Sequence, residues 1–269
     1  MALTFTLTQN PSVPLEAEAL CPDRVVGLNE TQIAALTVMH GNEKASVGDF
    51  FKVSGRPNGE LRVEGDLSRV KLIGANMTQG RVVVLGNVGL HLGAGMSGGE
   101  ILVEGNASDW VAPDMVGGRI TIKGNAGHMV GSCYRGARTG MRGGEIIVHG
   151  KVGNEAGNGM RRGLIAVGGN SGDFTGVSML AGTVIVLGEM GIRAGASMKR
   201  GTIVSMRPAE VLPTFSYAGT LSPQFLGLYL THLQGLGLPV TDAHFQGPYK
   251  QWRGDSLELN RGELLLLAD

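Results

Sequence analysis

The sequence predicts an all-β fold: a right-handed parallel β-helix of about nine rungs with 19-residue coils. Three observations carry this prediction. Glycine is very abundant, at 45 of 269 residues; a methionine-glycine motif recurs at regular intervals; and apolar residues alternate inside each copy. Because Val, Ile and Leu recur in register, the glycine content indicates a repeat fold rather than disorder. We expect a capping segment at 1–48, the β-helix at 49–207, and a C-terminal tail at 208–269 with one helix and a terminal strand.

The repeat unit is a methionine, two variable residues, a glycine, five residues of strand character and a second glycine. Its copies begin at Met77, Met96, Met115, Met141, Met160, Met179 and Met198. Successive copies are 19 residues apart, except for one interval of 26 that contains a seven-residue insertion. The seventh copy keeps Gly201 but ends on Arg207 instead of glycine. Such a period is typical of solenoid proteins.

Six copies contain a strand whose second and fourth positions are apolar, as in Ile120 and Ile122, and the seventh has Ile203 and Ser205 there. The segments around Leu61 and Phe51 fit the same register, which gives nine rungs between about 49 and 206. One copy cannot bury its inward side chains alone. Stacking buries them when each rung pairs in parallel with the next at about 4.8 Å, which makes a rod of roughly 40 Å.

The corners and the outward positions support this stacking. We expect the glycines to mark corners that need a positive φ or that leave no room for a Cβ. Asparagine follows the corner glycine in four copies, where it tolerates the left-handed region and can stack its amide between coils. The first strand position alternates in charge along Glu60, Arg81, Glu100, Arg119 and Glu145. Such neighbours favour in-register pairing, although each exposed pair adds little.

The middle outward position is apolar in the last four copies: Ile147, Ala166, Ile185 and Val204. An exposed apolar stripe of this length would promote association with other molecules, so we expect the tail or another subunit to bury it. In the flanks, 3–7 reads as a strand and Glu30–Met39 as a short helix. Ser222-Pro223 reads as the start of a helix running to about Gln234, and the last residues read as a strand.

Composition excludes several classes of function. Lys+Arg and Asp+Glu both total 23, so no overall charge attracts nucleic acid or an anionic membrane. No apolar run is long enough to span a bilayer, and the N-terminus does not resemble a secretory signal. The two cysteines form no disulfide framework. We therefore expect a cytoplasmic protein. A left-handed hexapeptide helix would need a different period, and the calcium-binding nonapeptide coil needs signatures that do not occur.

The sequence suggests no catalytic residue and no metal site. No two of the six histidines stand at metal-ligand spacing. His149 reads as a surface residue, and His128 with Cys133 is a candidate reactive pair in the insertion. The glycine-rich run 89–99 resembles a dinucleotide loop, but it lies inside the repeat and no helical pattern follows. A polysaccharide-lyase groove would need stacked acidic ligands, and here the stacked acids alternate with arginines.

Basic residues recur at one corner of the later coils, and others lie in the insertion beside Tyr134. Insertions into regular coils commonly carry function. We interpret the set either as a cationic patch that binds an anionic ligand tail or partner, or as a solvated corner. Its members are Arg135, Arg138, Arg142, Arg161, Arg162, Lys199 and Arg200.

The chain resembles a known family in three features: GDFFKV at 48–53, the Met-x-x-Gly coils with one lengthened turn, and PTFSYAG at 213–219. The coils resemble the glycine-rich domain of the glutamate synthase large subunit. The whole chain is similar to the C subunit of formylmethanofuran dehydrogenase, and within that family to the C subunit of the bacterial formyltransferase/hydrolase complex. The resemblance implies a non-catalytic subunit in tetrahydromethanopterin-linked conversion of formyl groups to formate.

The resemblance also implies partners: amidohydrolase-like, molybdopterin-enzyme-like and formyltransferase subunits of one complex. It implies a methanofuran-type carrier and tetrahydromethanopterin, with metal in the amidohydrolase-like subunit and no cofactor held by this chain alone. Two alternatives stay open, a C subunit of a CO2-reducing formylmethanofuran dehydrogenase and a stand-alone glutamate synthase-type domain. A free-standing enzyme that acts on a polymer is a third class of function. Purification under native conditions, with identification of the proteins that co-purify, would distinguish it from the others.

Overall fold

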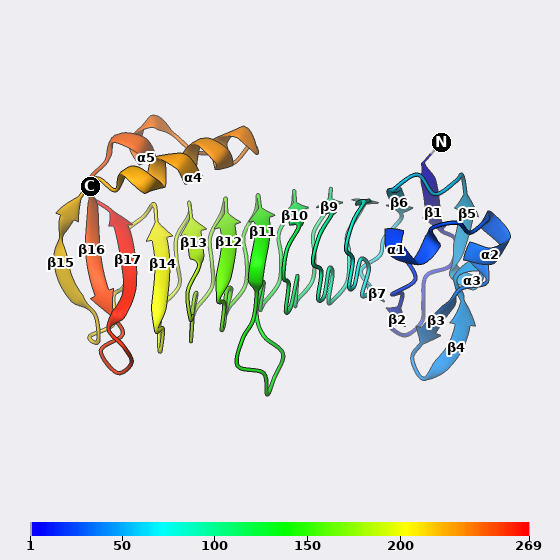
Figure 1. Cartoon of the computed structure of the whole chain (residues 1–269), viewed down its shortest axis with the longest axis horizontal. Coiled ribbons are helices and arrows are strands. Elements are labelled where there is room, and N and C mark those ends of the chain that lie inside the picture. Colours follow the sequence, from blue (N-terminus) through cyan, green and yellow to red (C-terminus); the bar gives the residue numbers. More distant parts are fainter. Residues whose placement is uncertain (1, 269) are drawn as a thin grey trace.

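The computed structural model describes residues 2–268 and shows an elongated stack of strands that is capped at both ends (Figure 1). The central strands are β6 (Glu60–Glu64), β8 (Arg81–Leu85), β9 (Glu100–Val103), β10 (Arg119–Ile122), β11 (Arg142–Val148), β12 (Arg162–Val167), β13 (Thr183–Val186) and β14 (Arg200–Ser205). The ends add β1 (Leu3–Leu7), β5 (Phe51–Ser54), β15 (Ser216–Leu221), β16 (Tyr249–Gly254) and β17 (Arg261–Leu267). Together these form one 13-stranded sheet in the order β15-β16-β17-β14-β13-β12-β11-β10-β9-β8-β6-β1-β5.

Consecutive copies of the repeat stack in parallel and in register. Ile101 pairs with Ile120, and Ile120 pairs with Ile146 across the insertion. A second column of parallel bridges runs through Leu67, Val88, Ala107 and Ala126, and resumes from Val152 through Ser171 to Met190. The inward residues of the strands are buried, and all seven repeat methionines have 0% exposure. Consecutive repeats therefore stack in parallel around one apolar core, in a fold made mostly of strands.

The two glycine corners serve different purposes. Gly118, before a strand, has φ +87, and a Cβ there would lie 2.6 Å from Cε of Met96. Gly105, after a strand, has no positive φ, but a Cβ there would lie 2.5 Å from the carbonyl oxygen of Gly86. One corner needs a left-handed backbone packed on a methionine, and the other needs close approach of two coils.

The asparagines stack between coils but do not take the left-handed conformation. Oδ1 of Asn87 accepts a hydrogen bond from the backbone N of Asn106 at 2.9 Å, and Oδ1 of Asn106 accepts from the backbone N of Asn125 at 2.8 Å. The left-handed backbone occurs instead at a later coil position, at His91 and Trp110 with φ 62 and 59. The stacking part of the prediction is confirmed, and the left-handed part is wrong.

The N-terminal end departs from the sequence prediction at two points. β5 runs antiparallel to β1, so the Phe51 segment is not a rung, and β1 instead pairs in parallel with β6. Alternation of apolar residues is the same for both strand directions, which explains the wrong prediction. The expected helix 30–39 is only α2 (Glu30–Ala34), because the β-branched Thr37 and Val38 begin β3 (Thr37–His40).

The remaining elements cover the first coils. α1 (Pro22–Val25) and α3 (Val47–Phe50) lie at this end of the stack (Figure 1). A second sheet has the order β4-β3-β2-β7, with β2 (Leu15–Glu16), β4 (Glu43–Ser46) and β7 (Val70–Lys71). β2 pairs in parallel with β7, which joins the N-terminal segment to the coil edge.

The C-terminal tail extends and covers the stack. β17 pairs in parallel with β14, and β15 and β16 add antiparallel strands beyond it. α4 (Gln224–Gly235) lies across the later coils, followed by α5 (Asp242–Gln246) (Figure 1). Leu226, Leu230 and Leu233 of α4 form one buried cluster with the predicted outward stripe. That stripe, Ile147, Ala166, Ile185 and Val204, has 0% exposure. The tail itself therefore buries it. Within residues 2–268, none of the helices combines the length and apolar character that a membrane-spanning helix needs.

Candidate functional site

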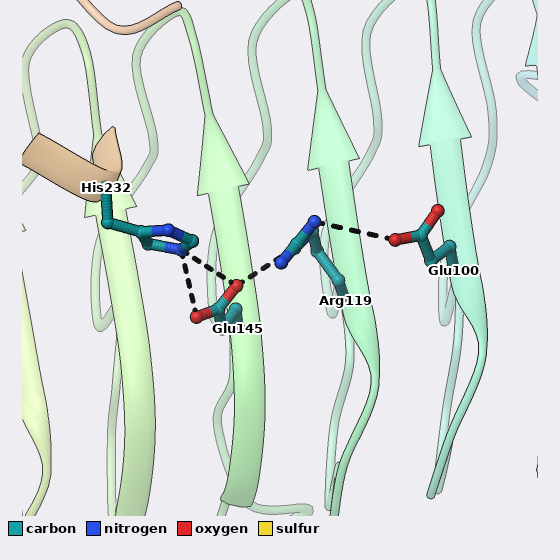
Figure 2. A network of polar contacts seen from close by, with 4 residues as sticks. All are labelled: Glu100, Arg119, Glu145 and His232. Carbon is teal, nitrogen blue, oxygen red and sulfur yellow. Dashed lines mark hydrogen bonds and ion pairs between the residues drawn. The ribbon is translucent and has the colours of Figure 1, made fainter. Parts of the chain in front are cut away.

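A polar ladder joins the coils to helix α4 (Figure 2). In-register pairing places the first strand positions side by side, so Arg119 contacts Glu100 at 3.5 Å and Glu145 at 2.9 Å. The earlier pair Arg81–Glu60 is 3.8 Å apart. These contacts confirm the charge alternation that the sequence predicted. His232 of α4 completes the ladder, with Nε2 3.1 Å from Oε1 of Glu145. Sequence spacing does not reveal His232, because it lies 87 residues from its partner.

An open groove of about 1020 Å³ lies between α4 and the beginnings of strands β11–β14. Its lining includes the basic residues Arg161, Arg162, Lys199 and Arg200, the α4 residues Phe225, Leu228 and Tyr229, and Leu259 from the segment between β16 and β17. Leu228 is 79% exposed and Leu259 is 52% exposed. The groove thus combines cations with uncovered apolar side chains.

The structure brings together only part of the predicted basic set. Arg161, Arg162, Lys199 and Arg200 line the groove, and Arg142 is paired in register with Arg162 on the neighbouring strand. Arg135 and Arg138 instead lie exposed on the loop before β11, outside the groove lining. That loop projects from the strand-start side of the stack (Figure 1). The seven residues therefore form a basic groove with a separate basic loop.

The base of the loop is held by aromatic residues from earlier coils. The Tyr134 hydroxyl lies 3.0 Å from Nδ1 of His91, and the Tyr134 ring stacks on Trp110 at a centroid distance of 5.2 Å. Burial, followed by the nearby Lys71 charge, lowers the pKa of His91. Sequence analysis assigned no role to His91 or Trp110. Their equivalent coil positions, 19 residues apart, are the signal that could have paired them.

The candidate catalytic residues have structural partners. Nδ1 of His128 accepts a hydrogen bond from the backbone N of Asn154 at 2.9 Å, as asparagine side chains do in other coils. Burial raises the pKa of the Cys133 thiol, which disfavours the thiolate that a nucleophile needs. Burial and then Lys123 lower the pKa of His149, whose Nε2 is 3.2 Å from Nζ of Lys123.

Metal-binding side chains do not cluster in the described chain: no three His, Cys, Asp or Glu residues between 2 and 268 are placed to hold an ion. The groove thus places exposed cations next to exposed apolar side chains of α4.

Comparison with known proteins identifies relatives. No protein family model matches the chain. One solved structure, a chain of the formyltransferase/hydrolase complex (FhcABCD) from Methylorubrum extorquens in complex with methylofuran, matches with a TM-score of 0.92 and 32% identity. This match covers 99% of the present chain and 100% of the other.

Curated relatives match over shorter segments. The C subunit of molybdenum-containing formylmethanofuran dehydrogenase 1 from Methanothermobacter thermautotrophicus is 44% identical over 30% of this chain and 20% of its own length. The C subunit of tungsten-containing formylmethanofuran dehydrogenase 2 from Methanothermobacter wolfeii is 43% identical over 34% and 35%, respectively. The matched segments thus span about a third or less of these relatives. Together with the full-length structural match, they show that the chain belongs to the family of formylmethanofuran dehydrogenase C subunits.

Proposed function

We propose that this chain is a non-catalytic structural subunit of a multi-subunit formyltransferase/hydrolase complex in tetrahydromethanopterin-linked one-carbon metabolism. The observation that carries the proposal is the match to a chain of the FhcABCD complex, which extends over 99% of this chain at 32% identity. Support for the non-catalytic role comes from His128 and His149, whose ring nitrogens have structural partners, and from the raised pKa of Cys133.

In this proposal the stack is a right-handed parallel β-helix (49–207) with an N-terminal cap (1–48) and a C-terminal tail (208–269). It supports amidohydrolase-like, molybdopterin-enzyme-like and formyltransferase subunits in the cytoplasm. A methanofuran-type carrier moves formyl groups between their active sites, and tetrahydromethanopterin supplies the formyl group. The metal belongs to the amidohydrolase-like subunit. The methylofuran in the similar complex supports the choice of carrier.

The experiment is purification of the tagged chain from its own cells under native conditions. We expect the other subunits of the complex to co-purify in fixed ratio, and the preparation to release formate from the formylated carrier. Removal of the chain should leave the partners unable to assemble. A chain that purifies alone, from cells in which the other subunits are present, would contradict the proposal.

We further propose that the basic loop either guides the anionic tail of the carrier or contacts an acidic partner surface. Arg135 and Arg138 are exposed there, and guanidinium groups bind carboxylates by paired hydrogen bonds. The double variant Arg135→Glu, Arg138→Glu separates the roles. Loss of carrier from an intact complex, increasing with salt, indicates tail binding, whereas disassembly indicates docking. If the double variant assembles, retains carrier and turns over normally, the loop is a solvated corner that binds neither the carrier nor a partner.

The alternative is a C subunit of a formylmethanofuran dehydrogenase, which the 44% and 43% identities of the matched segments favour. The alternatives differ in the metal content of the purified complex. Molybdenum or tungsten in stoichiometric amount, with reduction of CO2, would support the dehydrogenase. Formyl transfer and hydrolysis without either metal would support the first proposal.

A further inference from the structure

Helix α4 has two apolar faces, and the chain covers only one of them. Leu226, Leu230 and Leu233 pack on the later coils. Phe225 and Leu228, at helical spacing, line the groove instead; Tyr229 also lines it but packs partly on the buried cluster, and His232 there contacts Glu145. Phe225 is 42% exposed and Leu228 is 79% exposed. A contiguous apolar surface of this kind marks an interaction site in a folded protein.

The wall opposite α4 is basic with a regular spacing. The register of β12, β13 and β14 places Arg162, Ala181 and Arg200 at the same coil position, and Arg161, Leu180 and Lys199 one residue earlier. Arg162 and Arg200 are therefore two coil spacings apart, roughly 10 Å, with an apolar pair between them, and Arg142 is paired with Arg162 on the other side. β17 continues the series, because Arg261 pairs with Arg200.

These cations are largely free of acidic partners. Among residues 2–268, Lys199 has an ion pair, with Glu258 at 3.8 Å. Arg161, Arg162 and Arg200 take part in none of the ion pairs formed within this range, and all three are exposed. The groove therefore presents positive charge that a bound acidic group would complement.

We propose that this groove binds an amphipathic helix of a partner subunit, with two acidic residues seven positions apart and apolar residues between them. In a helix, seven residues advance by about 10.5 Å and return to the same face, which matches the separation of Arg162 and Arg200. The intervening residues at three and four positions then face Leu180 and Ala181. A strand fits less well, since its same-face residues are about 6.7 or 13 Å apart.

The apolar wall distinguishes this occupant from a purely anionic carrier tail. A tail of carboxylates would satisfy the arginines but leave Leu228 and Leu259 in water. An amphipathic helix covers both walls together, with its acids on the strand starts and its apolar face on α4. Helix-in-groove recognition uses such anchors at positions i, i+3 or i+4, and i+7.

This inference rests on the proposed role as a subunit, and the test uses the whole complex. A photo-crosslinking residue replaces Leu228 in one variant and the exposed Lys151, at the other end of the coil strand, in a matched control. We expect the probe at 228 to attach to a helical segment of a partner with acids seven residues apart, and the probe at 151 to leave that segment unmodified.

A second measurement uses charge and polarity. Leu228→Asp, and separately Arg162→Glu with Arg200→Glu, should weaken retention of the crosslinked partner by about tenfold or more, whereas Lys151→Glu should not. All of these positions are exposed, so the isolated variants should melt like the wild-type chain. Reversing the two acids on the partner helix should restore retention by the Arg162→Glu, Arg200→Glu chain.

Three results overturn the inference while the proposed function stands: a crosslink from 228 to a second copy of this chain, partner retention equal to the control, or loss of carrier alone from an intact complex. A wild-type chain that retains no partner defeats the proposed function, and the groove assignment falls with it. A crosslink to the predicted kind of helix, with rescue by charge reversal, supports it.

Discussion

At the scale of single residues, the repeat is held by contacts between a side chain on one coil and the backbone of the next. Each repeat methionine ends against the glycine that begins the following strand, as Met96 does against Gly118. Each stacked asparagine accepts a backbone hydrogen bond from the next coil. His128 fills the same role with its ring nitrogen. These residue types recur because each coil needs the same methionine contact and the same hydrogen bond to the backbone of the next coil.

Gly118→Ala tests this requirement. The change forces an alanine to φ +87 and places its Cβ 2.6 Å from Cε of Met96. The left-handed backbone costs about 1–2 kcal/mol and overpacking about 1–3 kcal/mol. We expect chemical denaturation to show a free energy of unfolding lowered by about 2–4 kcal/mol. Gly227→Ala in α4 is the control, since its Cβ meets nothing within 4 Å and alanine favours helix. Equal stability of the two variants would contradict the stacking role.

Replacement of His128, Cys133 and His149 one at a time tests the absence of chemistry on this chain. We expect turnover of the assembled complex to stay within a few-fold of wild type, whereas loss of a general acid or base costs roughly 100-fold or more. His128→Asn keeps an acceptor for the backbone N of Asn154 and should melt higher than His128→Ala. A loss near 100-fold in an intact complex would make the altered residue catalytic.

At the scale of elements, α4 covers the part of the sheet that the repeat leaves apolar. Its leucines and the outward stripe form a second core beside the one inside the coils. The ion pair ladder ends on the same helix, where His232 meets Glu145. Burial of these apolar side chains holds α4 on the sheet, and the contact between His232 and Glu145 aligns the helix with β11. The tail thereby becomes part of the structure of the later coils.

Ile185→Asp tests this second core. Ile185 has 0% exposure under α4, so the substitution buries a carboxylate without a partner. Such a charge costs about 4 kcal/mol or more, which lowers the melting temperature by roughly 10 °C or more. Thr121→Asp is the matched control, because Thr121 holds the equivalent position on β10, outside the cluster with α4. Thermal unfolding of the isolated chains measures both, and equal melting would exclude a covering role for α4.

The N-terminal cap is fastened by Asp23, whose carboxylate accepts hydrogen bonds from the backbone N of Thr78 at 2.8 Å and from its hydroxyl at 2.6 Å. Burial alone raises the pKa of Asp23, but these hydrogen bonds outweigh burial and hold the pKa below its usual range. The folded pKa lies below the unfolded one. The contact therefore stabilises the chain fully above about pH 3.9, and this contribution is lost as the pH falls through the folded pKa.

Asp23→Ala should lower the stability by about 1 kcal/mol at neutral pH, the usual contribution of an exposed hydrogen-bonded group. Melting followed from pH 7 downward should show the difference from wild type shrinking below about pH 3.9. The control is Glu189→Ala, an exposed carboxylate with no hydrogen bond or ion pair to the described residues. A difference that stays constant down to pH 2 would assign the effect to packing instead.

At the scale of the whole molecule, the N- and C-terminal segments cap the stack by adding strands to its two ends. β1 pairs in parallel with β6 at one end and β17 with β14 at the other, so each end coil receives a strand from a terminal segment. Antiparallel strands then follow outward, β5 at one end and β16 and β15 at the other. An open coil edge would invite strand addition, and at each end the terminal segments occupy the edge of the last coil.

Removal of residues 208–269 should expose both the β14 edge and the apolar stripe. We expect the truncated chain to self-associate, which size-exclusion chromatography with light scattering measures as a concentration-dependent mass above that of one chain. A chain lacking the exposed residues 135–138 of the loop keeps both caps and serves as the control. A truncated chain with the mass of a single copy would show that the tail is not needed as a cap.

The sequence determined the period, the strands, the inward residues and the charge alternation, because each depends only on spacing along the chain. The methionine and the glycine of the repeat recur at intervals of 19 residues, with one interval of 26, so the stacking of coils can be inferred before any contact is seen. The covered stripe at Ile185 could likewise be anticipated, since an apolar outward position needs a neighbour. The basic residues were identifiable, but their arrangement was not.

Only the tertiary structure decided the direction of β5, the identity of the cover over Ile185, and the grouping of the arginines. Alternation carries no strand direction, so β5 resembled a rung. The groove requires that Arg162 and Leu228, far apart in sequence, lie on opposite walls, and that depends on where α4 docks. Arg135 lies apart from Arg162 because it belongs to the loop that projects before β11 (Figure 1). Contacts between distant segments are set by packing of whole elements, which local spacing does not specify.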